Sequence, residues 1–166
     1  MDSLLARLRS VWRGQIESGG SHCPVCDRWG KIYGRNINKT MAQSLIWLCH
    51  AEGDAEGWVD VPAKAPRWVV QSNQLPTLKW WGLVERRGND GKNKTKFSGM
   101  WRPTAKGLDF VHHGARIEKQ VFTYNDEVQG YGTATVTLRD CFEDNFDYQS
   151  TMNTYLPAHL RKGVTP

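Results

Sequence analysis

The sequence predicts an α+β fold, and three observations in its middle third support that prediction. Leu75, Leu78 and Trp81 place an apolar stripe at helical spacing. Gly82 ends this helix, and a strand pattern begins directly after it. Thr104 then stands where it can cap a further helix. Helix and strand signals therefore alternate over a short stretch, as they do where helices pack on a small sheet.

The composition limits the classes of protein to consider. With 166 residues and 39% hydrophobic content, the chain can form one domain with appendages or two very small ones, and full disorder is excluded. The net charge of +5 and the sequence pI near 9.1 favour acidic partners such as nucleic acid. Seven cations lie between 86 and 106, against Asp90 as the one anion: Arg86, Arg87, Lys92, Lys94, Lys96, Arg102 and Lys106.

The first predicted element is an amphipathic helix from Ser3 to about Ile16. Apolar side chains recur at 4, 5, 8, 11, 12 and 16, with arginines on the other face. We expect this helix to pack on the body of the protein, and a basic helix on a membrane surface is the alternative. Arginines interrupt the apolar positions, so the segment does not resemble a signal peptide, and no segment approaches a membrane span. We therefore expect a cytoplasmic protein without a membrane partner.

The Cys23-Pro-Val-Cys26 turn is the best-defined chemical motif. Two thiolates three positions apart can share one zinc ion while the backbone amides of the turn donate to the sulfurs. A tetrahedral site needs two further ligands, for which His22, Cys49 and His50 are nearest. The sequence therefore predicts a structural Zn²⁺ held by Cys23, Cys26, Cys49 and His50. The alternative is a turn of reduced thiols in a reducing cytoplasm, with Cys49 packed in a core.

The region from 39 to 113 predicts a winged helix-turn-helix domain through the order of its elements. A helix, a short strand, two helices, a strand, a basic loop and a second strand follow one another, which is the order that such a domain needs. A further helix begins after Thr104. The predicted helices span 39–52, 67–71 and 75–81, and the predicted strands begin near 57, 83 and 100.

Two resemblances to known proteins rest on these segments. The pattern Leu-x-x-Leu-x-x-x-Gly-Leu-Val-x-Arg at 75–86, followed by Arg-Pro-Thr-Ala-Lys-Gly-Leu-x-Phe-Val at 102–111, resembles the recognition helix, wing and next helix of MarR- and PadR-like regulators. That family usually has Leu-Thr-x-x-Gly in the second motif. Pro103 replaces the leucine and removes a strand donor, which implies a shorter wing or a sheet edge.

The second resemblance covers more of the chain and points to bacteriophages. The Cys-Pro-x-Cys turn, Tyr33 to Asn38, a Met-Ala-x-x-Leu-Ile helix, the Trp-Gly-Leu turn and a late Phe-x-Tyr are similar to proteins encoded in bacteriophage genomes. This resemblance implies a phage origin and a bacterial host cytoplasm, and it implies no mechanism.

The predicted function is binding of double-stranded DNA by the third helix and the wing, in the manner of a transcription regulator. Asn73, Thr77 and Trp80 are expected to face outward with Lys79 on the flank, where Asn reads adenine and Lys reads guanine or phosphate. Clustered cations in the wing favour phosphate contact. The predicted interface comprises Asn73, Thr77, Lys79, Trp80, Arg86, Arg87, Lys92, Lys94, Lys96 and Arg102. The alternative is a solvated charged hairpin on a module that binds a host or defence protein.

The remaining sequence predicts a small second unit and no enzyme. Strands at 120–124 and 127–131 form a hairpin, and Thr137 caps a short acidic helix. No phosphate loop, nucleophile elbow or zinc-hydrolase motif is present, so the acidic cluster at 140–147 is expected to be a solvated face. The predicted division is an amino-terminal helix and knuckle at 1–38, a winged-helix domain at 39–113, a hairpin and helix at 114–157, and a mobile tail at 158–166.

Overall fold

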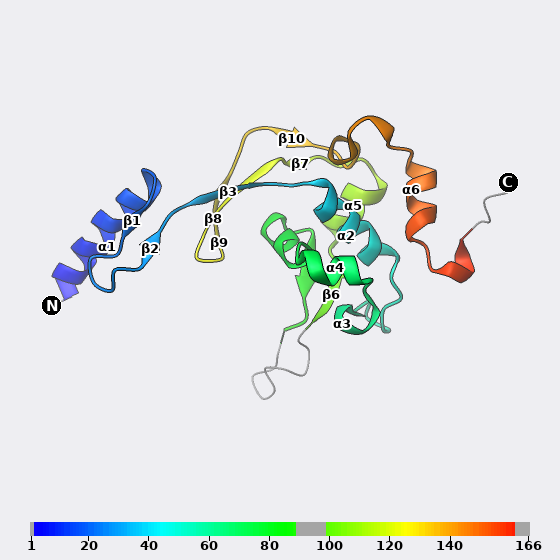
Figure 1. Cartoon of the computed structure of the whole chain (residues 1–166), viewed down its shortest axis with the longest axis horizontal. Coiled ribbons are helices and arrows are strands. Elements are labelled where there is room, and N and C mark those ends of the chain that lie inside the picture. The colour runs from blue at the N-terminus through cyan, green and yellow to red at the C-terminus, as the bar shows by residue number, and fades with distance from the viewer. Residues whose placement is uncertain (1, 89–98, 162–166) are drawn as a thin grey trace. The chain divides into compact units, whose positions relative to one another are not determined.

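The computed structural model describes residues 2–88 and 99–161, which form a mixed α+β protein with small antiparallel sheets (Figure 1). The chain divides into two compact units. Unit 1 comprises Met1–Asn36 and Lys119–Ala134, and unit 2 comprises Ile37–Glu118 and Thr135–Pro166. Over the described ranges, no helix has the length and hydropathy of a membrane-spanning segment.

Unit 1 is built from one helix, a short hairpin and a three-stranded sheet in the order β3–β8–β9. The helix packs on the hairpin, where the indole Nε1 of Trp12 donates to the carbonyl of Ser21 at 3.2 Å. Ile16 is the buried apolar residue of the helix, whereas Leu4 and Val11 are exposed. The elements are α1 (Asp2–Glu17), β1 (Ser21–His22), β2 (Trp29–Gly30), β3 (Tyr33–Asn36), β8 (Gln120–Tyr124) and β9 (Glu127–Tyr131).

Helix α2 is at the centre of unit 2, where it contacts strand β6 and helices η1, α5 and α6. Its main sheet is antiparallel with the order β4–β6–β5. The elements are α2 (Lys39–His50), β4 (Val59–Asp60), α3 (Val61–Lys64), α4 (Arg67–Ser72), the 3-10 helix η1 (Leu75–Trp81), β5 (Val84–Arg86), β6 (Met100–Pro103), α5 (Ala105–His112), β7 (Ile117–Glu118), β10 (Thr135–Val136), the 3-10 helix η2 (Arg139–Asn145), α6 (Tyr148–Tyr155) and the 3-10 helix η3 (Ala158–Leu160).

Local sequence explains why α2 forms and what it buries. The side chain of Asn38 caps the helix by accepting a hydrogen bond from the backbone of Met41 at 2.9 Å. Leu45 and Ile46 on the inner face are fully buried. Trp81 is also in this core, and its Nε1 donates to the carbonyl of Glu118 at 2.7 Å, so the large indole is buried with its polar atom satisfied.

The predicted cap at Thr104 is present and fixes α5 against the sheet. The Thr104 hydroxyl oxygen accepts from the backbone of Gly107 at 3.1 Å and the hydroxyl donates to the carbonyl of Gly82 at 2.6 Å. Gly107 lies so close to Leu83 that a Cβ at this position would be 2.1 Å from the Leu83 carbonyl oxygen. The Thr-x-x-Gly spacing therefore supplies both the cap and the close approach of helix to strand.

The division of the chain differs from the prediction, because the hairpin β8–β9 pairs with β3 rather than joining the carboxyl-terminal helix. Arg35 faces Val121 in this antiparallel register. The acidic helix also begins differently: η2 follows Leu138, and the Asp140 carboxylate accepts from the backbone and hydroxyl of Thr137 at 2.8 and 3.1 Å. These hydrogen bonds lower the pKa of Asp140.

The predicted tail is structured at its start. Residues 158–160 form η3, and His159 lies 3.4 Å from the carboxylate of Glu52. The rest of the predicted tail, 162–166, lies outside the described residues.

Candidate nucleic-acid interface and cysteine knuckle

Helix η1 is a 3-10 helix, which explains the three-residue spacing of its buried side chains. Leu75, Leu78 and Trp81 recur every three residues and are all buried, as expected when residues i and i+3 eclipse. The helix packs against both α2 and β5. Trp80 is 9% exposed, which corrects the expectation that it faces outward. Helix α2 and strand β5 cover two of the three faces of η1. The side chain of Lys79 lies on the third face, which is exposed.

The polar residues predicted for the third helix lie on two separate elements. Asn73 is exposed, but it ends α4 in the left-handed conformation with φ 53°, so it precedes η1 rather than standing on it. The Thr77 hydroxyl donates to the carbonyl of Gln74 at 2.5 Å, within the first turn of η1. A continuous recognition helix from 73 to 81 is therefore absent, and Asn73 and Lys79 are the exposed polar side chains that remain.

Two of the predicted phosphate-binding arginines are in contact with carboxylates of the same unit. Arg87 lies 3.5 Å from Asp54. Arg102 forms an ion pair with Glu85 and stacks on the ring of Trp58, with its guanidinium carbon 4.1 Å from the ring centroid. These contacts give Arg102 a structural role across the sheet.

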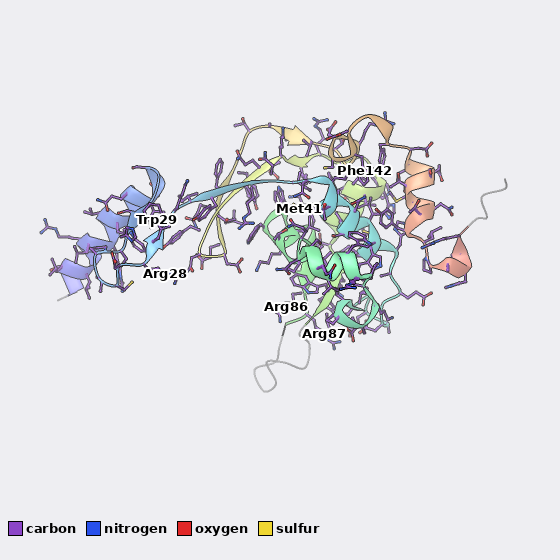
Figure 2. All side chains as sticks on the ribbon, viewed as in Figure 1. Arg28, Trp29, Met41, Arg86, Arg87 and Phe142 are labelled. Carbon is purple, nitrogen blue, oxygen red and sulfur yellow. The ribbon has the colours of Figure 1, made fainter. Side chains whose placement is uncertain are left out.

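The structure describes only one of the remaining predicted cations. Arg86 is exposed at the end of β5, where Figure 2 labels it beside Arg87. Lys92, Lys94 and Lys96 lie outside the described residues. The described part of the predicted interface therefore reduces to Asn73, Lys79 and Arg86 as its exposed polar residues.

A cleft of about 690 Å³ in unit 2 was not predicted from the sequence. Trp47 of α2, Trp68 of α4, and Tyr155 of α6 line it, together with Gln43 and Arg161. Burial raises the pKa of Tyr155, and the hydrogen bond with Gln43 opposes that shift. Sequence periodicity indicates that Trp47 lies outside the buried face of α2. It does not indicate that α6 lies across the cleft from Trp47.

Three histidines of unit 2 form a second unpredicted cluster at the ends of α2 and α5. The ring centroids of His50 and His112 are 5.5 Å apart, and Nδ1 of His112 lies 2.7 Å from the hydroxyl of Tyr148. Burial, followed by the charges of His50 and His113, lowers the pKa of His112. His50 therefore contacts α5 side chains rather than a cysteine pair.

The Cys-x-x-Cys segment forms a compact turn between β1 and β2 in unit 1. The backbone of Cys23 donates to the carbonyl of Arg28 at 2.8 Å, and the backbone of Asp27 donates to the carbonyl of Cys23 at 2.9 Å. Hydrogen bonds from the backbone amides of Cys26 and Val25 lower the pKa of the Cys23 thiol. Sulfur atoms that already accept amide hydrogen bonds are a feature of metal-binding knuckles.

The structure does not assemble the predicted zinc ligand set within one unit. Cys23 and Cys26 belong to unit 1, whereas Cys49 and His50 belong to unit 2. Cys49 lies on the apolar side of α2, where burial raises its pKa to about 12. Among the residues that the structure describes, no three His, Cys, Asp or Glu side chains form a group that could hold a metal ion.

Comparisons with known proteins add no family to these observations. Neither a protein-family model, nor a curated protein, nor a solved structure matches the chain.

Proposed function

We propose that unit 2 is a winged-helix module that binds double-stranded DNA. The observation that carries this proposal is the order of its elements together with the pairing of its strands. Helices α2, α4 and η1 precede the hairpin β5–β6, and β4 pairs with β6 so that the sheet order is β4–β6–β5. A winged helix-turn-helix domain needs this order, with the loop between its last two strands as the wing.

The charges around the hairpin support duplex DNA as the ligand. The sequence between β5 and β6 contains Lys92, Lys94 and Lys96 against Asp90. Exposed Arg86 stands at the end of β5. Clustered cations gain affinity for phosphates through the release of counterions, so this segment is the expected contact with the DNA backbone.

Two of the basic residues of unit 2 already contact carboxylates of the same unit. Arg87 and Arg102 contact Asp54 and Glu85, so binding a phosphate would compete with an existing contact. Arg86 and Lys79 have exposed side chains, so both are accessible to a DNA ligand.

The test is the salt dependence of binding to a labelled duplex of mixed sequence, measured by fluorescence anisotropy. Arg86→Glu is expected to weaken binding about tenfold and to reduce the slope of log affinity against log salt by about one, because one phosphate contact is lost. Lys119→Glu is the matched control, since it makes the same charge change at an exposed position of unit 1. An equal loss in this control, or no duplex binding at low salt, would contradict the proposal.

Binding of a host or defence protein is the second candidate, and the cleft of unit 2 favours it. Aromatic side chains are enriched in protein interfaces, and Trp47, Trp68 and Tyr155 line this cleft. This candidate predicts that Trp68→Ala abolishes partner capture while duplex binding is absent from the unmodified protein. DNA binding that Trp68→Ala leaves unchanged would favour the first candidate.

A further inference from the structure

We propose that the knuckle formed by Cys23 and Cys26 binds Zn²⁺ as one half of a four-thiolate site, and that the same knuckle of a second copy of this chain supplies the other half. The inference concerns unit 1 and does not depend on DNA binding by unit 2.

The knuckle has the local geometry of a metal-binding turn before any metal is present. Two backbone hydrogen bonds of 2.8 and 2.9 Å close the loop between Cys23 and Arg28. Asp27 takes the left-handed conformation with φ 61°, which turns the chain back into β2 directly after Cys26. The backbone of the turn is therefore already closed around the two cysteines that would hold the metal.

The rest of the chain offers poor ligands to complete the site. Structural zinc takes four ligands in a tetrahedral arrangement, and the knuckle supplies two. The two other cysteines, Cys49 and Cys141, are partly buried in unit 2, and desolvation raises their pKa values to about 12 and about 11. His22 and Asp27 flank the pair, and Nδ1 of His22 lies 2.9 Å from the carbonyl oxygen of Asp27, but among the described residues no three His, Cys, Asp or Glu side chains form a group that could hold a metal ion.

The surface around the two sulfurs is suited to a symmetric contact with a second copy. Cys26 is exposed, Val25 at the tip of the turn is 68% exposed, and Trp29 on the adjoining strand is 48% exposed. In a two-fold contact the same patch meets itself, so Val25 and Trp29 of each copy would cover apolar surface beside the metal. Figure 2 shows Arg28 and Trp29 on this hairpin.

Metal binding also changes the charge and releases protons. Binding converts four thiols and one Zn²⁺ into a complex with net charge −2 and releases four protons to solvent. Asp27 and Arg28 of each copy are both exposed next to its knuckle, and their formal charges cancel.

The experiment is a titration of the full-length protein, freed of metal under reducing conditions, with Co²⁺ followed by Zn²⁺. The expected end point is one metal ion per two chains, with the intense visible absorption of tetrahedral cobalt thiolates and its loss when Zn²⁺ displaces the cobalt. Sedimentation velocity is expected to show a dimer with zinc and a monomer with chelator. The metal titration and the sedimentation measurement are made without DNA, so their results do not depend on whether unit 2 binds DNA.

The variants separate the possible ligands. Cys26→Ser is expected to lose the metal and the zinc-dependent dimer, whereas the matched variant Cys49→Ala keeps both. One Zn²⁺ per monomeric chain would overturn the inference, and so would a dimer that persists without metal or a protein that binds no cobalt. The titration of the unmodified protein decides the question even where a variant fails to fold.

Discussion

Replacement of Gly107 by alanine is expected to destabilise unit 2, although alanine is the better helix former. In an exposed helix this change adds about 1 kcal/mol of stability, because alanine restricts the unfolded chain. Gly107 instead lies at backbone contact distance from Leu83, the residue before strand β5. An added Cβ would lie 2.1 Å from the carbonyl oxygen of Leu83, where ordinary contacts begin at 3.4 Å. The obstacle is backbone, which a rotamer change cannot remove.

The size of the effect follows from that overlap. Helix α5 or the start of β5 must move by about 1 Å, and overpacking of this kind costs up to about 3 kcal/mol. After subtraction of about 1 kcal/mol of helix propensity, we expect a net loss of about 2 kcal/mol. For a chain of this length, that loss corresponds to a fall of about 4–8 °C in the thermal midpoint.

Urea unfolding, followed by tryptophan fluorescence and circular dichroism, measures the change in the free energy of unfolding. Gly88→Ala is the matched control in the same unit, because a Cβ there meets no atom within 4 Å. We expect the control to stay within about 0.5 kcal/mol of the unmodified protein. A Gly107→Ala protein that equals or exceeds the unmodified protein in stability would refute the close packing of α5 on β5.

Three further predictions follow from the contacts described above. Arg102→Gln removes the ion pair with Glu85 and is expected to cost about 1 kcal/mol in urea unfolding, with little change in duplex affinity. Burial lowers the pKa of His112, so the unfolded chain binds a proton more readily and stability falls as pH drops below about 6.5; His112→Gln should flatten that loss in unfolding curves measured across pH. In the metal-free protein, iodoacetamide at about pH 8 should modify Cys23 in the native state and Cys49 only after denaturation, as peptide mass spectrometry would show.

Local signals in the sequence were sufficient for several elements. The hairpin strands at 120–124 and 127–131 match β8 and β9. Their turn explains the success, because Asn125 and Asp126 both adopt positive φ, at 50° and 64°, as a two-residue hairpin turn requires. Thr104 was likewise recognisable as a cap because the capping hydrogen bond spans three residues.

Contacts between distant segments could not be predicted in the same way. Alternation identifies β8 as a strand but does not identify β3 as its neighbour. The carboxylates that contact Arg87 and Arg102 follow from sheet pairing, which brings β4, β6 and β5 together. Burial of Trp80 likewise depends on the two elements that η1 contacts. Among the residues that the structure describes, fewer side chains of the predicted interface are exposed than the sequence led us to expect.

The pairing of β3 with β8 also determines the order in which the protein can fold during synthesis. Arg35 leaves the ribosome about 85 residues before its partner Val121, an interval of roughly 4–17 seconds at ordinary elongation rates. Helix α2 and the β5–β6 hairpin are complete within that interval. Strand β3 therefore waits with an open edge while the first segment of unit 2, residues 37–118, is synthesised, and the amino-terminal segment, although translated first, completes its sheet late.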